Sequence, residues 1–347
     1  MGDVILLFGG PTRERLVSVA SAQNVARLLA APRCCFWSPE GAVFETGVAE
    51  LGAHERPFEV EFAPRGAPRW RELKRALADW SEERDLVVFL GLHGGAAEDG
   101  TLQGWLDEHR LAYTGSGRAA SRDAFDKARA REIARAHGLR VAEAALLDGA
   151  DVPRARSRIL ELLGRFPRLV LKPVADGSSM GLRFVSSPAE VEPALHAIKD
   201  EGIPYLAEAF VQGTELTVGV ADAEDGLRAL PCSEVRIVEP AASFDYAAKY
   251  LGRGVREITP AEVAPEIAAE AQRVALVAHR ALGCFGYSRT DVIVDAHGPV
   301  YLETNTLPGL TRASFIPQQL EAAGIPMRAF LERQIALARR RGAARGA

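Results

Sequence analysis

Residues 289–305 read RTDVIVDAHGPVYLETN, and this stretch carries the most specific structural signal in the chain. Two runs rich in β-branched residues flank Asp295–Pro299, a segment with the Asp, Gly and Pro content that is typical of turns. The pattern predicts a β-hairpin with a five-residue turn, in which Val294 pairs with Val300.

The predicted hairpin register brings acidic side chains together. It places Asp291 opposite Glu303, and period-two alternation puts Arg289 and Asn305 on the same face as this pair. Two carboxylates about 5 Å apart repel by roughly 3 kcal/mol at an effective dielectric constant of ~20. A bound Mg²⁺ ion would neutralise them, with Asp291, Glu303 and Asn305 as oxygen ligands and open positions for phosphate. An exposed hairpin whose acids face water or pair with Arg289 fits the same pattern, so the hairpin alone does not decide.

A lysine followed by a small-residue loop gives a second signal. Lys172 ends an apolar run and precedes Pro173 and the loop Asp176–Gly181. Successive backbone N–H groups of such a loop can wrap phosphate oxygens, and the loop is long enough to close as a lid. Glycine and serine are equally typical of an ordinary hairpin loop. Only five of the 42 basic residues are lysines, which favours sites that need a compact charge.

Two further motifs have better explanations than the chemistry they suggest. Gly177–Gly181 matches the Gly-x-Ser-x-Gly elbow of serine hydrolases, but Leu182–Val185 is a predicted strand where the elbow needs a helix. Gly115–Ala120 matches a loose dinucleotide fingerprint, and a plain strand-to-helix turn is the better interpretation. No Gly-Lys pair occurs in the sequence, which excludes a Walker-type phosphate loop.

The composition is that of a globular enzyme. The chain has 347 residues, 48% hydrophobic and 25% charged, which suits two or three domains and excludes disorder for most of its length. The near balance of 42 basic and 46 acidic residues predicts small-molecule partners, with no nucleic acid and no membrane. No secretion signal or membrane-spanning run is found, which predicts the cytoplasm. The four cysteines show neither metal nor disulfide spacing.

Strand and helix patterns alternate regularly over about the first 115 residues, which predicts a parallel α/β sheet. The stretch from Pro32 to Arg71 has no clear pattern, and the later part of the chain is typical of α+β lobes. The predicted division is an α/β domain (1–117), a central lobe (118–210), a C-terminal lobe (211–338) and a flexible basic tail (339–347). The predicted strands are Val4–Phe8, Leu86–Leu90, Leu111–Tyr113, Leu169–Leu171, Arg183–Val185, Tyr205–Phe210, Glu215–Val220, Arg289–Val294 and Val300–Asn305, and the predicted helices are Ser18–Ala30, Ser121–His137 and Ala261–Leu282.

Together these segments resemble the ATP-grasp ligases, and within them the D-alanine-D-alanine ligases of cell-wall synthesis. The resemblance runs from Phe8 to about Ile325. It implies an ATP-grasp fold of α/β and α+β lobes, with an N-terminal Rossmann-like parallel-sheet domain. The matching motifs are Gly9-Gly10, Glu14–Ser18, Leu92–Gly94, Glu98–Gly104, Tyr113–Gly117, Lys172–Gly181, Asp245–Tyr250, Glu303–Gly309 and Ser314.

The resemblance implies an ATP site between the central and C-terminal lobes. Its lysines would hold the phosphates, and its glutamates would accept hydrogen bonds from adenine and ribose. In this chain Phe210 would stack on the base and compensate for the lysine that Ala209 replaces. The metal ligands, for Mg²⁺ or for Mn²⁺ in its place, agree with the hairpin analysis. The implied ATP-binding residues are Lys127, Lys172, Ser179, Glu208, Phe210 and Glu215, and the implied metal ligands are Asp291, Glu303 and Asn305.

The implied reaction joins two D-alanines. ATP phosphorylates the carboxylate of the first D-alanine, and the amine of the second attacks the resulting acyl phosphate. The implied catalytic residues are Glu14, Ser178, Tyr250, Arg289 and Ser314, and the implied substrate-binding residues are His93, Lys249 and Gly309.

Each of these residues has an implied role. Glu14 would take the ammonium of the first D-alanine, with His93 nearby, and a hydrogen-bonded link from Glu14 through Ser178 and Tyr250 would close the lid. Arg289 and backbone N–H groups near Gly309 would stabilise the oxyanion of the tetrahedral intermediate. Ser314 and Lys249 would hold the carboxylate of the second D-alanine.

One position departs from the family pattern. Where the family usually carries Glu-Lys at the adenine site, this chain has Glu208 followed by Ala209, so one side-chain contact to the base is missing. Ala209 leaves a catalytically silent nucleotide-binding protein as one alternative. A paralogue that joins other small amino or hydroxy acids is another alternative within the same class. Tyr250 favours a dipeptide product, because relatives that use D-lactate resemble phenylalanine there. The family also implies a homodimer.

Overall fold

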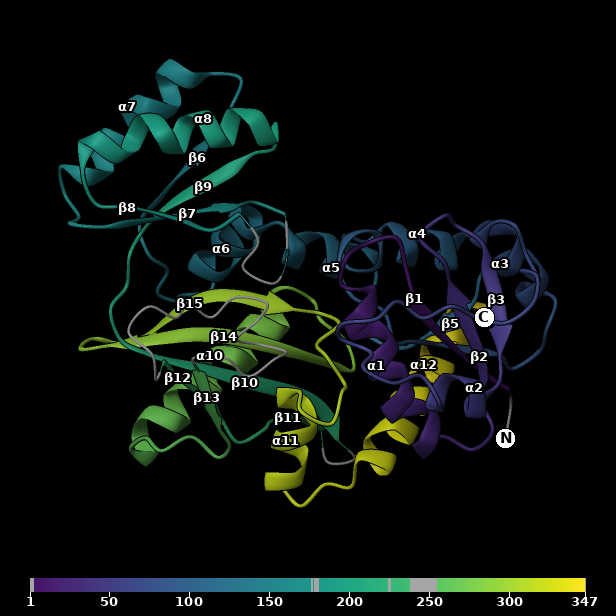
Figure 1. Ribbon diagram of the computed structural model, residues 1–347. Helices are drawn as coiled ribbons and strands as arrows, with labels where there is room; N and C mark the ends of the chain where they lie inside the picture. The colour runs from purple at the N-terminus through teal and green to yellow at the C-terminus, as the bar shows by residue number, and fades with distance from the viewer. Residues whose placement is uncertain (1–2, 176, 178–180, 224–225, 238–254, 347) are drawn as a thin grey trace.

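Over the residues that it describes, the computed structural model contains three β-sheets, each packed with helices (Figure 1). The four-stranded sheet lies above the six-stranded sheet, and the five-stranded sheet lies to one side of the six-stranded one (Figure 1). The residues that the structure describes are 3–175, 177, 181–223, 226–237 and 255–346.

The first lobe is built on a sheet with the order β3-β2-β1-β4-β5, whose strands are parallel except for β3. Its central strand β1 (Val4–Gly9) is almost completely buried, which explains its continuous apolar run. The other strands are β2 (Arg33–Trp37), β3 (Val43–Thr46), β4 (Val87–Leu90) and β5 (Ala112–Tyr113).

Helices cover both faces of this sheet. One face packs on α1 and on α12, the last helix of the chain, with Phe8 and Leu331 in one core. The other face packs on α3 and α4, with Leu7 and Leu77 in a second core. The helices are α1 (Arg15–Leu28), α2 (Val48–Gly52), α3 (Leu73–Ser81), η1 (Gly95–Ala97), α4 (Thr101–Glu108) and α12 (Met327–Gly346).

The second lobe is built on an antiparallel sheet with the order β6-β9-β7-β8. Leu171 and Ala207 face the core beneath α7 and α8, so alternation turns Lys172 and Glu208 to the opposite face. That face is directed toward the third lobe (Figure 1). The elements are β6 (Ala144–Leu147), α7 (Val152–Leu163), β7 (Leu169–Pro173), β8 (Arg183–Val185), η2 (Pro188–Glu190), α8 (Val191–Glu201) and β9 (Tyr205–Ala209).

The third lobe is built on an antiparallel sheet with the order β13-β12-β10-β14-β15, to which β11 adds by pairing with β10. Helix α10 covers one face, where Ala275 and Ala278 pack against Val218 and Val292. The elements are α5 (Arg118–Phe125), α6 (Lys127–Ala136), β10 (Thr214–Ala223), β11 (Gly226–Ala229), β12 (Ser233–Ile237), β13 (Val255–Ile258), α10 (Pro265–Ala281), β14 (Tyr287–Asp295), β15 (Gly298–Asn305) and α11 (Phe315–Ala322).

The hairpin of β14 and β15 has the predicted pairs at the end that carries the candidate metal ligands. Asp291 lies opposite Glu303, and Arg289 lies opposite Asn305. Thr290 and Val292, which alternate with these residues on β14, are fully buried on the α10 side. The four polar side chains therefore share the face that looks away from α10.

The turn of the hairpin was predicted wrongly. Val294 pairs with Pro299 and not with Val300, and the turn is shorter than five residues because the strands pair down to Asp295. A β-bulge follows along the hairpin, where the register skips Leu302. This one-residue shift compensates for the shorter turn, and without it the acid that follows Leu302 would point to the other face.

The predicted strands are present, with small differences at their ends. One helix differs: the predicted Ser121–His137 is two helices, α5 and α6, which break at Asp126. Asp126 has an extended backbone and caps α6, because its Oδ1 accepts a hydrogen bond from Arg129 N at 2.9 Å. Lys127 is therefore the first residue of a helix. The stretch without a clear pattern contains β2, β3 and α2.

The segment predicted as a flexible basic tail (339–347) lies largely within helix α12. Helix α12 continues to Gly346, and Arg341 donates to Gly115 O at 2.8 Å and to Tyr113 O at 2.6 Å. These hydrogen bonds attach α12 to the end of β5 and to the turn after it.

The boundary between the second and third lobes also follows from the packing. Helices α5 and α6 pack with α10 and the six-stranded sheet, so the lobe on the four-stranded sheet begins at β6.

The structural context of both weaker motifs agrees with the interpretations given above. The strand β8 follows Gly181, and the motif Gly115–Ala120 spans the turn after β5 and the first residues of α5. A separate observation concerns membranes: among the described residues, no helix combines the length and the apolar character that a bilayer span requires.

We expect Gly9→Ala to lower the free energy of unfolding by about 3 kcal/mol or more. Gly9 has φ +94°, and an added Cβ would lie 2.4 Å from Trp37 O, so a clash adds to the backbone strain. Gly41→Ala is the matched control, because Gly41 has φ +97° and no atom within 4 Å of an added Cβ. It should cost only about 1–2 kcal/mol. Urea denaturation measures both, and equal losses would contradict the close approach at Gly9.

Candidate active site

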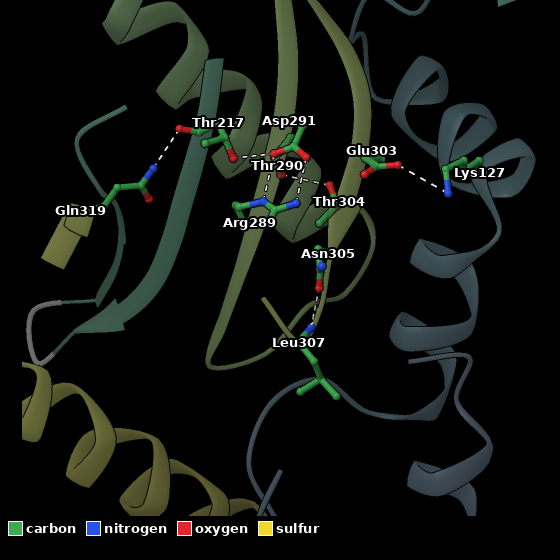
Figure 2. A network of polar contacts seen from close by, with 10 residues as sticks. All are labelled: Lys127, Thr217, Arg289, Thr290, Asp291, Glu303, Thr304, Asn305, Leu307 and Gln319. Carbon is green, nitrogen blue, oxygen red and sulfur yellow. Dashed lines mark hydrogen bonds and ion pairs between the residues drawn. The ribbon is translucent and has the colours of Figure 1, made fainter. Parts of the chain in front are cut away.

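Asp291 lies at the centre of a polar network on the face of the six-stranded sheet (Figure 2). Its carboxylate accepts two hydrogen bonds from Arg289, from Nε at 3.0 Å and from Nη2 at 2.9 Å. Thr217, its neighbour on β10, donates a third hydrogen bond from its hydroxyl group. Asp291 is only 7% exposed, so these contacts hold its carboxylate in one orientation.

Glu303 has a cation of its own. Its Oε2 lies 3.5 Å from Nζ of Lys127, on helix α6, as Figure 2 shows. The backbone N–H of Lys127 donates to Val174 O at 2.9 Å, so the start of α6 is attached to the segment that follows Lys172. The facing carboxylates are thus neutralised separately, Asp291 by Arg289 and Glu303 by Lys127. For Asp291, pairing with Arg289 is the alternative that the sequence left open.

The three candidate metal ligands are close together but already hydrogen-bonded or ion-paired. Asn305 Oδ1 accepts a hydrogen bond from Leu307 N at 2.9 Å. Among the described residues, no group of three or more His, Cys, Asp or Glu side chains is arranged around a metal position. The donor set still fits Mg²⁺ chemically, because two carboxylates and an amide oxygen share one face, and hard divalent ions prefer oxygen ligands.

A second charged cluster lies on the facing sheet. Glu208 is 4% exposed and forms ion pairs with both Lys172 and Arg131. Arg131, also 4% exposed, comes from α6, one turn after Lys127, and donates to Ala142 O as well. Sequence reasoning missed Arg131, because an arginine in a helix rich in arginine gives no signal of its burial.

The residues expected around adenine and ribose differ in their exposure and in the strands that carry them. Phe210 is 38% exposed, and the Arg168 guanidinium lies 4.7 Å from its ring centre. Phe210 follows Glu208 by two residues, which places it on the same face. Glu215 lies on β10 and by alternation shares the face of Thr217. Ala209, at the position where the family usually has lysine, is 8% exposed.

Glu14 lies where the first lobe meets the loop after β7. A Cβ added to Gly94 would lie 2.1 Å from Glu14 Oε2, and one added to Gly177 would lie 2.8 Å from Oε1. Its carboxylate is therefore enclosed by two glycines, one from each lobe. This places Glu14 beside Gly177, whereas the expected partner Ser178 lies outside the described residues.

His93 connects the first lobe to the loop after β15. Its Nδ1 lies 2.9 Å from Leu307 O, and its Nε2 lies 3.0 Å from Ser21 Oγ. A carbonyl only accepts, so Nδ1 carries the proton and Nε2 accepts from the serine. Burial lowers the pKa of His93 to about 4, with the nearby Arg289 charge adding to the effect. Both ring nitrogens of the neutral ring are used to hold this loop.

Glu98 is a carboxylic acid that sequence reasoning did not assign to the site. It is 8% exposed, and burial raises its pKa well above the usual value. The negative charge of Glu14 raises the pKa further, and Arg289 opposes this shift. The interactions with Glu14 and Arg289 indicate that all three residues belong to one electrostatic cluster.

Ser314 begins helix α11 as its N-cap residue. Its hydroxyl group accepts from Thr311 N at 3.2 Å and lies 2.8 Å from Thr311 Oγ1. A Cβ added to Gly309 would lie 2.7 Å from Ser314 Oγ, so the loop backbone passes close to this hydroxyl group. The implied oxyanion loop and the implied carboxylate ligand are thus adjacent.

The structure connects several of the expected residues to one another or to each other's loops. Lys127 connects to Glu303, Glu14 meets the loop after Lys172, and His93 holds the loop that leads to Gly309. Four expected residues lie outside the part of the chain that the structure describes: Ser178, Ser179, Lys249 and Tyr250.

Comparison with known proteins gives a consistent result. Residues 3–116 match the family model described as D-ala D-ala ligase N-terminus, and residues 133–336 match that described as D-ala D-ala ligase C-terminus. The D-alanine-D-alanine ligase of Leptospira interrogans is 41% identical over 278 residues, covering 78% of this chain and 76% of that protein. The enzyme of the same name from Leptospira biflexa is 36% identical, covering 94% and 95%. The structure of the D-alanine-D-alanine ligase from Coxiella burnetii has 25% identity and a TM-score of 0.80, covering 99% and 95%.

We expect the free energy of unfolding to fall as the pH drops from about 6.5 toward 4, in part because of His93. The folded chain keeps this ring neutral, with a pKa of about 4, whereas the unfolded chain protonates it below about 6.5. Stability is therefore present above pH 6.5 and lost below it, by up to about 3 kcal/mol for this group.

Urea denaturation from pH 7 to 4.5 measures this dependence. His93→Gln should have a smaller pH slope than the wild type, and His279→Gln should do the same, because burial also lowers the pKa of His279 to about 4. A His93→Gln slope equal to that of the wild type would contradict a neutral, buried imidazole.

Proposed function

The chain belongs to the D-alanine-D-alanine ligase family. We propose that the charged residues around Asp291 and Glu303, together with those around Glu208, form its active site. As an ATP-dependent ligase it joins two D-alanines to D-alanyl-D-alanine, a precursor of peptidoglycan. The observation that carries the site proposal is the Lys127–Glu303 contact. It brings a candidate phosphate ligand on α6 and a candidate metal ligand on β15 to one place.

The reaction needs activation because a carboxylate is a poor electrophile. Phosphoryl transfer from ATP converts the carboxylate of the first D-alanine to an acyl phosphate, and the amine of the second displaces the phosphate. Such transfers depend on positioning and on neutralised charge more than on covalent help from the protein. A site with several cations beside buried carboxylates is suited to this task.

Lys127 and Lys172 bind the ATP phosphates in our proposal. Each lysine is paired with a glutamate here, Lys127 with Glu303 and Lys172 with Glu208, and both are only 12% exposed. Phosphate oxygens would compete for these ammonium groups. Ser179 adds a contact from the closing loop.

Asp291, Glu303 and Asn305 would hold Mg²⁺, or Mn²⁺ in its place. When bound, the ion neutralises phosphate charge and lowers the barrier to transfer. Arg289 and Thr217 already fix the Asp291 carboxylate on the required face, which reduces the reorganisation needed for binding.

The nucleobase and ribose lie against the four-stranded sheet in our proposal. Glu208 and Glu215 accept hydrogen bonds from adenine and ribose, and Phe210 stacks on the base. Ala209 offers no charged contact at the lysine position of the family. Arg168, stacked on the Phe210 ring, is a cation close to this site.

The amino-acid substrates lie on the side of the first lobe. Glu14 binds the first ammonium group, and its link through Ser178 to Tyr250 closes the lid. Arg289 and the backbone near Gly309 stabilise the tetrahedral oxyanion.

The second carboxylate is held by Ser314 and Lys249. His93 acts indirectly, because its two ring nitrogens hold the loop that contains Gly309. It therefore positions this loop and is not a direct ligand of substrate.

Three wider proposals follow from the family. The reaction takes place in the cytoplasm, where ATP is available, and the active form is a homodimer. The units of the chain are an α/β domain over 1–117 and two ATP-grasp lobes, with α12 returning to the first of these units.

We expect ATP hydrolysis to require both D-alanine and a divalent cation, with L-alanine inert. Phosphate release measures turnover, and mass spectrometry should identify D-alanyl-D-alanine as the product. Turnover only with D-lactate or D-serine as acceptor would favour a paralogue. ATP binding without D-alanine-dependent turnover would favour a silent nucleotide-binding protein and would overturn the proposal.

We expect Glu303→Gln to lower kcat by roughly 10²–10³-fold or more, because the variant loses a carboxylate at the point where charge must be neutralised. Asp295→Asn is the control on the same hairpin, since Asp295 pairs with Arg140 outside the cluster. It should keep near-normal kcat. Circular dichroism and melting temperature test whether both variants fold. Normal turnover by a folded Glu303→Gln protein would refute the metal assignment.

A further inference from the structure

Gln319 makes an unusual set of contacts for a glutamine on a short helix. It lies on α11, its side chain is 0% exposed, and both ends of its amide group are used. Its Oε1 accepts from Gly219 N at 2.8 Å, and its Nε2 donates to Thr217 O at 2.9 Å and to Ser233 Oγ at 3.0 Å. Figure 2 shows the contact with Thr217.

This amide group completes the hydrogen bonding of strand β10 where strand pairing is interrupted. Pairing of β10 with β12 ends at Thr217 and Ser233, and pairing with β11 begins at Val220. The backbone oxygen of Thr217 and the N–H of Gly219 lie between these two segments. Gln319 supplies one acceptor and one donor there, as a neighbouring strand would.

The residue at position 219 lets α11 come this close. A Cβ added to Gly219 would lie 2.6 Å from Gln319 Oε1 and 2.7 Å from Ile316 Cδ1. Only glycine leaves room for the helix against the strand. Gly219 on β10 pairs with Arg289 on β14. Helix α11 therefore packs beside the two strands whose pairing positions Arg289.

The start of α11 carries groups of the proposed site. Ser314 is its N-cap, and the ring centre of Phe315 lies 5.8 Å from the Arg289 guanidinium. Thr217 joins the two ends of this arrangement, because its carbonyl accepts from Gln319 while its hydroxyl group donates to Asp291. One residue of β10 therefore contacts both the helix of Ser314 and the candidate metal ligand.

A second glutamine closes the network. Oε1 of Gln318 accepts from Thr259 Oγ1 at 3.1 Å, and this hydroxyl group lies 2.6 Å from Ser233 Oγ. Ser233 is also a partner of Gln319. Helix α11 is thus attached to β10, β12 and the end of β13 through a continuous set of hydrogen bonds, which restricts its rotation and sliding.

We propose that Gln319 is a positioning residue, which fixes Ser314 at the start of α11 relative to Arg289 and Asp291 and thereby sets the affinity for the second amino-acid substrate. The proposal rests on the proposed function, because Ser314 matters here as a ligand of the acceptor carboxylate. The buried amide group of Gln319, more than one helical turn from the N-cap, determines where this ligand lies.

The test uses Gln319→Met, which keeps a similar volume and removes the amide group. Initial rates over a wide range of D-alanine, fitted to a two-site rate law, give two half-saturation constants. The acceptor constant is identified as the one that Ser314→Ala raises. We expect Gln319→Met to raise the same constant about tenfold or more, which is the size of effect seen when a residue that orients a binding group is removed. The KM for ATP should change by less than about twofold.

A double-mutant cycle separates positioning from general destabilisation. If Gln319 acts through Ser314, the acceptor constant of the double variant should be close to that of Ser314→Ala alone. Additive effects, or equal changes in both D-alanine constants and in the KM for ATP, would overturn the proposal. The proposed function fails in a different way, since the wild-type protein would then show no D-alanine-dependent turnover at all.

Gln334→Met is the matched control. Gln334 is 1% exposed, lies on α12, and both atoms of its amide group lack a hydrogen-bond partner among the described residues. This variant should leave both D-alanine constants unchanged. If Gln319→Met does not fold, Gln319→Glu retains the acceptor for Gly219 N but, when ionised, not the donor to Thr217 O, and its acceptor constant must rise selectively for the proposal to stand.

Discussion

Two negative charges that face each other across a hairpin are the constraint around which the site of this protein is arranged. Asp291 and Glu303 are direct neighbours on β14 and β15, and the structure resolves their repulsion by giving each a different cation. Arg289 comes from the same strand as Asp291, whereas Lys127 comes from a helix that leads to the next lobe. The repulsion between two strands is thus balanced by an attraction between the sheet and helix α6, which packs on it. This explains why an acidic pair can be kept in a partly buried position before substrate binds.

Helix α6 is the element that connects the two clusters. Its first residue, Lys127, contacts Glu303 on the six-stranded sheet, and Arg131, one turn later, contacts Glu208 on the four-stranded sheet. Spacing of four residues places both side chains on one side of the helix. Asp126 fixes where this helix begins, and so fixes the position of Lys127. The break that sequence periodicity did not predict is therefore part of the geometry of the site.

The sequence predicted that Asp291 and Glu303 share one face of the hairpin, because the side-chain period of a strand is two. The prediction was correct although it contained two errors whose effects on the register cancelled. The turn was shorter than expected, and the bulge at Leu302 moved the register back by one residue. A bulge of this kind has no clear local signature. Residues defined by tertiary contact were not predicted either. Arg131, Thr217 and Glu98 belong to residue types that are usually found on surfaces, and only the fold shows that they are buried.

The return of α12 to the first lobe has a consequence for the order in which the protein is made. Leu331 and Ile335, near the end of the chain, pack in the same core as Leu6 and Phe8. A ribosome makes β1 and α1 long before α12, so the part of this face that α12 covers stays exposed until α12 has been made. Apolar surface that is exposed during synthesis makes a folding intermediate prone to aggregation. This sheet is therefore fully covered only after the strands of the other two sheets have been translated.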